Sequence, residues 1–137
     1  MTTRRDQDQR GQSVSLFVLV ITAALILTAG LVIDGGQKVS AAGRAEAAAA
    51  GAARAAGNAA AAQTLARRDP VGPAVMAGKA YLAGEPGIAG SVSVSAGVVT
   101  VHTHASQGTI FLSVIGIARV SADGTAQANI VPTGRTR

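Results

Sequence analysis

An uncharged run of twenty residues, Val14 to Ile33, constrains this chain more than any other feature. Each helical residue rises about 1.5 Å, so a helix of this length covers roughly the 30 Å hydrocarbon layer of a bilayer. The run contains neither proline nor a charged side chain, and as a helix it leaves no backbone group unpaired in lipid. The sequence therefore predicts a transmembrane helix over residues 14–33, with the lipid bilayer as a partner.

Two interpretations that involve processing stay open beside a retained anchor. Residues 38–42 are small enough for cleavage of a secretory signal, but the apolar run exceeds the usual length of about 7–15 residues and ends well before them. Processing of the prepilin type is the other alternative. We prefer the retained anchor, because the run has the length of a span.

Charges around the run predict how the chain is oriented. Arg4, Arg5 and Arg10 precede the run, whereas Asp34 follows it before Lys38. Because basic residues stay on the cytoplasmic side, we expect a single-pass protein of the cell membrane with a cytoplasmic N-terminus and an extracytoplasmic body. Asp34 is then a positional marker at the outer membrane rim, since a carboxylate resists entry into lipid. A plain polar boundary of the span explains this residue equally well.

Composition limits what the body of the chain can be. Residues 34–137 suffice for one small domain, and the absence of cysteine excludes disulfides, thiolate metal sites and thiol nucleophiles. Alanine, which buries little area, dominates the apolar residues, so the domain is expected to depend on assembly with neighbours. The twelve Lys and Arg residues are scattered and lack interleaved aromatics, so no nucleic-acid partner is expected.

The sequence predicts an α+β fold in which long and short helices precede a small antiparallel β-sheet. The transmembrane helix continues into a long alanine-rich helix, because alanine has the highest helix propensity and Asp69-Pro70 ends the tract. Gly35-Gly36 is expected to be a flexible point between them, although Asp34 and Lys38 can pair if the helix runs through, so one long helix and two collinear helices both stay open. The expected segments are a cytoplasmic, disordered head (1–13), the span (14–33), the alanine-rich extracytoplasmic helix (34–69), a short helix with a small antiparallel sheet (70–130) and a flexible tail (131–137).

The segment after the long helix changes from helical to alternating periodicity. Residues 72–83 have apolar side chains at helical spacing, and residues 91–95 and 98–104 alternate around a tight turn at Ala96-Gly97. A last strand over 118–130 completes a three-stranded sheet against which the alanine-rich helix can lie. Between the strands, residues 109–117 are apolar and predict either a short buried helix or a strand; periodicity does not decide between them.

Small residues recur at every fourth position of the alanine-rich tract, at Gly43, Ala47, Gly51, Ala55 and Ala59. Such a stripe lets two backbones approach closely, which favours packing of this helix on another helix or on a sheet. Low sequence complexity produces the same pattern by itself, and the two interpretations stay open.

Signatures of catalysis and of bound cofactors fail on inspection. The glycines of residues 72–79 are one residue too far apart for a phosphate loop, and no serine or threonine follows Lys79. His102 and His104 share one face of a strand and lack an obvious third ligand, so we expect them on the solvent side rather than on a metal. The sequence therefore predicts no enzyme, no cofactor, no metal and no small-molecule substrate.

Several motifs occur in a fixed order along the chain. They are Arg10-Gly11-Gln12 before the span, the residues from Gly30 to Gly36 (GLVIDGG) at its outer end, the alanine-rich helix, and the hairpin followed by an apolar segment and a Ser/Ala strand. In this order they resemble the TadE/TadG-like proteins of tight-adherence (Flp) pilus assembly, and the resemblance implies a pilin-like fold. Pseudopilins cut by a prepilin peptidase usually carry Glu five residues after the glycine. Leu16 stands at that position here, which favours an uncleaved anchor.

The resemblance implies a non-enzymatic, single-pass component of a pilus assembly or a related surface apparatus. Its partners would be other membrane subunits of the pilus or secretion system, contacted through helix packing. The alternative is a membrane-anchored extracytoplasmic module that binds a partner protein or a cell-wall polymer.

Overall fold

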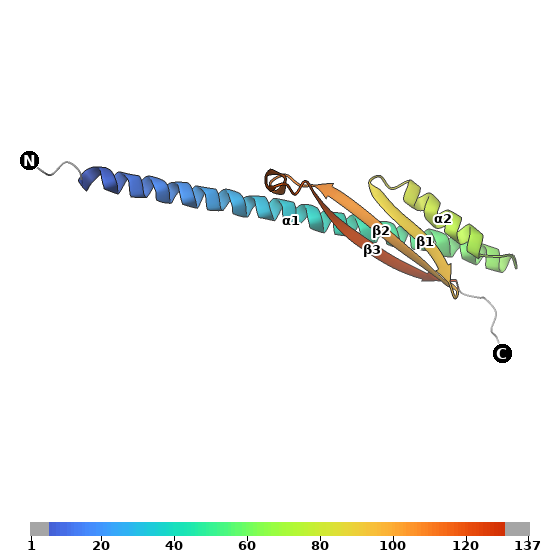
Figure 1. Ribbon diagram of the computed structural model, residues 1–137. Coiled ribbons are helices and arrows are strands. Elements are labelled where there is room, and N and C mark those ends of the chain that lie inside the picture. The colour runs from blue at the N-terminus through green and yellow to red at the C-terminus, as the bar shows by residue number, and fades with distance from the viewer. Residues whose placement is uncertain (1–5, 131–137) are drawn as a thin grey trace, which may run out of the picture.

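The computed structural model describes residues 6–130 and has the expected α+β class (Figure 1). One long helix is followed by a short helix and a three-stranded antiparallel sheet that lies along the distal half of the long helix. The elements are α1 (Asp6–Leu65), α2 (Val71–Ala83), β1 (Ile88–Ser95), β2 (Val98–Gly108), the 3₁₀ helix η1 (Leu112–Ile115) and β3 (Arg119–Asn129).

The long helix α1 is continuous over 60 residues. Gly35-Gly36 lies within this helix, and the helix is not interrupted at the flexible point that was expected there. It also begins at Asp6, within the head that was expected to be disordered; that expectation is wrong for residues 6–13, and residues 1–5 lie outside the described part. The absence of proline before Pro70 and the high helix propensity of alanine explain this continuity.

The turn between α1 and α2 comes slightly earlier than Asp69-Pro70 predicts. α1 ends at Leu65, and Arg67 adopts a left-handed conformation with φ of 55°, which reverses the chain. The Asp69 carboxylate accepts a hydrogen bond of 3.2 Å from the backbone N–H of Val71 and so covers one free donor at the start of α2. The short helix then packs back along α1 (Figure 1).

The sheet has the predicted hairpin and the predicted third strand. β1 pairs with β2 from Ile88↔Ala105 to Ser95↔Val98, and Ala96 and Gly97 form the connection with φ of 49° and 77°. Two positive φ angles in a two-residue loop match the twist of the strands that the loop joins. β2 pairs with β3 along eleven residues, so β2 is the central strand.

The core is a thin layer between the alanines of α1 and the inner face of the sheet. Val99 and Val101 of β2 are fully buried against it, and α2 adds Ala74 and Leu82. The buried alanines recur at helical spacing along one face of α1, at positions 41, 45, 48, 49, 52, 53, 56 and 60. Side chains this small let the sheet lie close to the helix backbone.

The sheet approaches the backbone of α1 closely where Gly124 of β3 lies against Ala45. A Cβ atom on Gly124 would lie 2.5 Å from the carbonyl carbon of Ala45, which real side chains do not do. Beside it, the Thr103 hydroxyl donates a 2.7 Å hydrogen bond to the carbonyl oxygen of Ala45. The sheet is therefore positioned on α1 by backbone contact and by one buried hydrogen bond.

We expect Gly124→Ala to lower the free energy of unfolding by about 1–3 kcal/mol, because the added methyl group pushes β3 away from the backbone of α1. Gly108→Ala is the matched control, since a Cβ atom at Gly108 meets nothing within 4 Å. The control should stay within about 0.5 kcal/mol of the parent. Thermal unfolding of the full chain in detergent micelles, followed by far-UV circular dichroism, measures both; equal effects of the two variants would contradict this contact.

Candidate functional site

The N-terminal half of α1 exposes its apolar side chains on all sides. Phe17 is 64% exposed and Leu27 is 73% exposed, and Gly30 is the exception in the run from Val14 to Ile33 because it is buried. The helix is long and apolar enough to cross a membrane by length and composition. Figure 1 shows most of this half of α1 projecting beyond the sheet, with the loop between β2 and β3 beside its distal end.

Asp34, directly after the apolar run, is the most unusual residue at this end of the helix. Its side chain is 1% exposed. Its carboxylate accepts three backbone N–H hydrogen bonds, from Ile110 at 2.8 Å, from Phe111 at 3.0 Å and from Leu112 at 2.6 Å. The residue that was expected to mark the outer rim of the membrane is therefore also the anchor for a loop more than seventy residues away in the chain.

That loop, residues 109–117, connects β2 to β3 and is called the apolar loop below. It contains η1 and ends its turn at Gly116, whose φ of 90° favours glycine. The expectation of a short buried helix or a strand is met only in part: a short 3₁₀ helix is present, but most of the apolar side chains of the loop are exposed, so the expected burial is wrong. The loop contacts α1 through backbone N–H groups at Asp34 and through one aromatic side chain, and this leaves most of its apolar side chains uncovered.

Electrostatics at Asp34 favour the charged carboxylate. Burial by itself raises the pKa of Asp34, but the three backbone N–H donors outweigh burial and bring its pKa below the ordinary value of 3.8. The donors belong to the first residues of a short helical turn, where N–H groups otherwise lack partners. A carboxylate at this position satisfies them and also interacts favourably with the turn's dipole.

One aromatic side chain of the loop contacts α1 one helical turn before Asp34, within the apolar run. A Cβ atom on Gly30 would lie 2.6 Å from Cγ of Phe111, so the Phe111 ring packs directly on the helix backbone there. The sequence analysis named Gly30 only as part of a motif and Asp34 as a marker of the membrane rim, and it predicted no contact of either residue with the loop. Their spacing of four residues, which puts both on one face of α1, was the signal that this face has a partner.

The stripe of small residues is divided among three environments. Gly51 is buried, and a Cβ atom there would lie 2.3 Å from the Tyr81 ring of α2. Ala55 and Ala59 are half-buried, whereas Gly43 and Ala47 are exposed. Of the two glycines in the stripe, Gly51 shows the close approach that the stripe predicts and Gly43 does not. Packing of the exposed members on another molecule stays a prediction.

The two histidines lie on the outer face of the sheet, as predicted from the alternation. Nδ1 of His104 lies 2.7 Å from the Asp123 carboxylate, and Nδ1 of His102 lies 3.1 Å from the Thr125 hydroxyl. Both side chains are exposed. Among residues 6–130, no group of three or more His, Cys, Asp or Glu side chains is placed to hold a metal ion.

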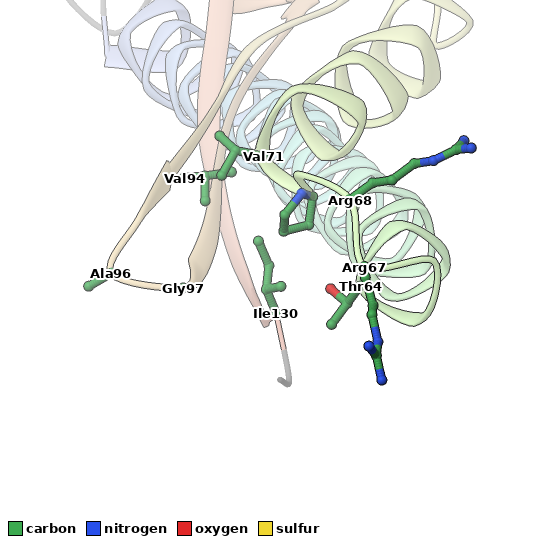
Figure 2. Close-up of a pocket in the computed structure, with 9 residues that line it drawn as sticks. Thr64, Arg67, Arg68, Val71, Val94, Ala96, Gly97 and Ile130 are labelled. Carbon is green, nitrogen blue, oxygen red and sulfur yellow. The ribbon is translucent and has the colours of Figure 1, made fainter. Parts of the chain in front are cut away.

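A hollow of about 430 Å³ lies at the opposite end of the domain from the apolar run (Figure 2). Val71, Val94 and Ile130 line it, and Figure 2 shows the side chains of Arg67 and Arg68 extending away from it into solvent. The residues around the hollow include neither a carboxylate nor a histidine. It offers apolar contact with a basic rim and has no arrangement of groups for acid–base chemistry.

Comparison of the chain with protein-family models, with curated proteins and with solved structures gives no match.

We expect Asp34→Asn to release the apolar loop, because an amide offers one acceptor oxygen and turns its own NH₂ group toward three donors. Hydrogen exchange of the amides of residues 110–112 should accelerate by about tenfold or more in detergent micelles. The matched control is Glu46→Gln, which neutralises an exposed carboxylate of the same helix. Unchanged exchange in Asp34→Asn would show that the carboxylate does not hold the loop.

The loop should also open in acid. Because the folded-state pKa of Asp34 is lowered, its stabilisation is complete above the ordinary value of 3.8 and is lost as the pH falls through the folded-state pKa. Amide chemical shifts of residues 110–112, recorded between about pH 7 and pH 2, should therefore move only below about pH 4. Asp34→Asn should show no such transition; a transition of equal size in that variant would assign it to another group.

Proposed function

We propose that this chain is a non-enzymatic, single-pass membrane component of a tight-adherence (Flp) pilus assembly of the TadE/TadG-like kind, or of a related surface apparatus. Its N-terminus lies in the cytoplasm, its domain lies outside the membrane, and it assembles with neighbouring subunits through α1. The proposal rests on the architecture and on the motifs around the span, from Arg10-Gly11-Gln12 to Gly36.

The observation that carries the proposal is that a single helix supplies both the apolar span and the wall of the domain core. The span from Val14 to Ile33 leaves its side chains uncovered, and the same helix runs on into the alanine face under the sheet. Uncovered apolar surface of this extent is stable in lipid and costly in water. A domain built lengthwise on its own anchor presents surfaces for assembly and needs no reactive centre.

Support for assembly through α1 comes from the side of the helix that faces away from the sheet. Gly43, Ala47 and Ala50 are exposed there, in contrast to the buried alanines Ala45 and Ala49. Small side chains on an exposed helix face permit a second helix to approach closely. The span and this face belong to one continuous helix, so a neighbouring subunit of the same kind can pack along both.

A second candidate function is that of a membrane-anchored module that binds a partner protein or a cell-wall polymer. The hollow at the distal end favours it, because that end lies farthest from the span and carries exposed Arg67 and Arg68 (Figures 1 and 2). An anionic polymer would meet positive charge there.

Single cysteines test the topology, since the natural chain contains none. We expect Gln127→Cys, on the exposed face of β3, to react with a membrane-impermeant maleimide on intact spheroplasts. Thr3→Cys, ahead of the span, should react only after lysis. The protein itself should stay in the membrane pellet after alkaline carbonate extraction. Labelling of Thr3→Cys before lysis, or recovery of the intact chain in the soluble fraction, would contradict the proposed anchor and orientation.

Oxidative cross-linking tests the helix interface. Ala47→Cys should form disulfide-linked dimers, or adducts with a matching single cysteine in a neighbouring pilus subunit, because its side chain lies on the exposed small-residue face. Gln127→Cys is the exposed control on the sheet. Equal yields from the two positions would show random collision rather than packing through α1. Loss of surface fibres on deletion of the gene, with restoration by the parent chain, distinguishes the pilus proposal from the binding module.

A further inference from the structure

We propose that the apolar loop, residues 109–117, is a second membrane contact that lies in the outer headgroup and acyl boundary of the bilayer, beside the span. This inference rests on the membrane anchor of the proposed function and adds a partner surface outside the span. Its occupant is lipid, and the following observations lead to that choice.

The first observation is the height at which the loop is attached. Phe111 packs on Gly30, three residues before the end of the apolar run at Ile33. At about 1.5 Å per residue, this contact lies roughly 4–5 Å inside the outer end of the run. When the run spans the bilayer, the Phe111 ring is therefore carried to the outer edge of the hydrocarbon layer, and Asp34 comes to lie just outside it.

The second observation is the surface that the loop presents. Most of its apolar side chains are exposed, and no described element of the protein covers them. The exposed fractions are 58% for Ile110, 85% for Val114, 71% for Ile115 and 47% for Ile117. No charged residue occurs between positions 109 and 117. This patch is continuous, through Phe111 and Gly30, with the uncovered apolar surface of the span, so one lipid phase can cover both.

The third observation concerns the backbone of the loop, because most of its N–H groups donate to acceptors within the protein. Apart from the three N–H groups that donate to Asp34, those of Val114, Gly116 and Ile117 donate to carbonyl oxygens within the loop at 3.0–3.1 Å. The Ser113 hydroxyl donates to the carbonyl of Ile110, and the Thr109 hydroxyl donates to that of Ile117. A non-helical segment enters the membrane boundary only where its polar groups are satisfied in this way.

Asp34 explains how a charge stays so close to the hydrocarbon. Its carboxylate is covered by the loop rather than by lipid, and the donors that satisfy it are the N–H groups that would otherwise enter the boundary unpaired. The interaction therefore removes two costs together, that of a buried charge without partners and that of backbone N–H groups without acceptors. A carboxylate that was only a polar boundary of the span would be solvated by water and would not need these donors.

Tryptophan fluorescence in vesicles tests the inference, because the natural chain contains no tryptophan. Three single-tryptophan variants of the full chain are reconstituted in phosphatidylcholine and phosphatidylglycerol vesicles, with or without lipid brominated near the headgroup end of its acyl chains. Val114→Trp probes the apolar loop, Leu27→Trp probes the span, and Gln127→Trp probes the exposed face of β3. We expect Val114→Trp to show blue-shifted emission and at least about half of the quenching of Leu27→Trp, while Gln127→Trp is unquenched.

The other outcomes separate failure of the inference from failure of the anchor. Quenching of Leu27→Trp without quenching of Val114→Trp would leave the span in place and overturn the loop contact. Blue-shifted but unquenched emission from Val114→Trp would show that a second copy of the protein, rather than lipid, covers the loop, and would also overturn the inference. Absence of quenching in Leu27→Trp would remove the anchor and the loop contact with it.

Discussion

The contact between β3 and the backbone of α1 is the constraint on which the rest of the structure depends. Gly124 lies against the carbonyl group of Ala45, and a Cβ atom at Gly124 would lie 2.5 Å from the carbonyl carbon of Ala45. The alanines each bury little area, but their small size brings the Thr103 hydroxyl within 2.7 Å of the Ala45 carbonyl oxygen. The sheet is therefore held at one height along α1, and so is every segment that its strands connect.

The fixed height of the sheet places the apolar loop opposite the outer end of the apolar run. β2 and β3 extend past Ala45 toward the span, and the loop that joins them meets α1 at Asp34 and Gly30. A carboxylate that receives three N–H donors pairs the loop backbone directly after the end of the apolar run. The same residue thus separates the apolar run from the alanine-rich part of α1 and joins the loop to the helix.

Local patterns in the sequence predict the elements of this fold but not the contacts between them. Alternating residues around Ala96-Gly97 predict the hairpin, and the outward position of His102 and His104 follows from the same alternation. The conformation of residues 109–117 is not predictable in this way, because their backbone is held by Asp34, more than seventy residues earlier. The continuity of α1 through Gly35-Gly36 has local causes in the absence of proline and in the alanines beyond the glycines, and contacts at Asp34 and Ala41 reinforce the helix on both sides of them.

Those two glycines explain why the loop contact matters mechanically. Each glycine weakens a helix by about 1 kcal/mol relative to alanine. A Cβ atom added at Gly35 or Gly36 would meet nothing within 4 Å, so no neighbouring segment packs on the helix there. They lie between Asp34, which the loop holds, and Ala41, which the sheet covers. The loop and the sheet are one covalent segment, so bending at the glycines would require breaking the Asp34 hydrogen bonds or lifting β3 from α1. The segment formed by β2, the apolar loop and β3 therefore braces α1 on both sides of the glycines, and the domain keeps a fixed orientation relative to its apolar helix.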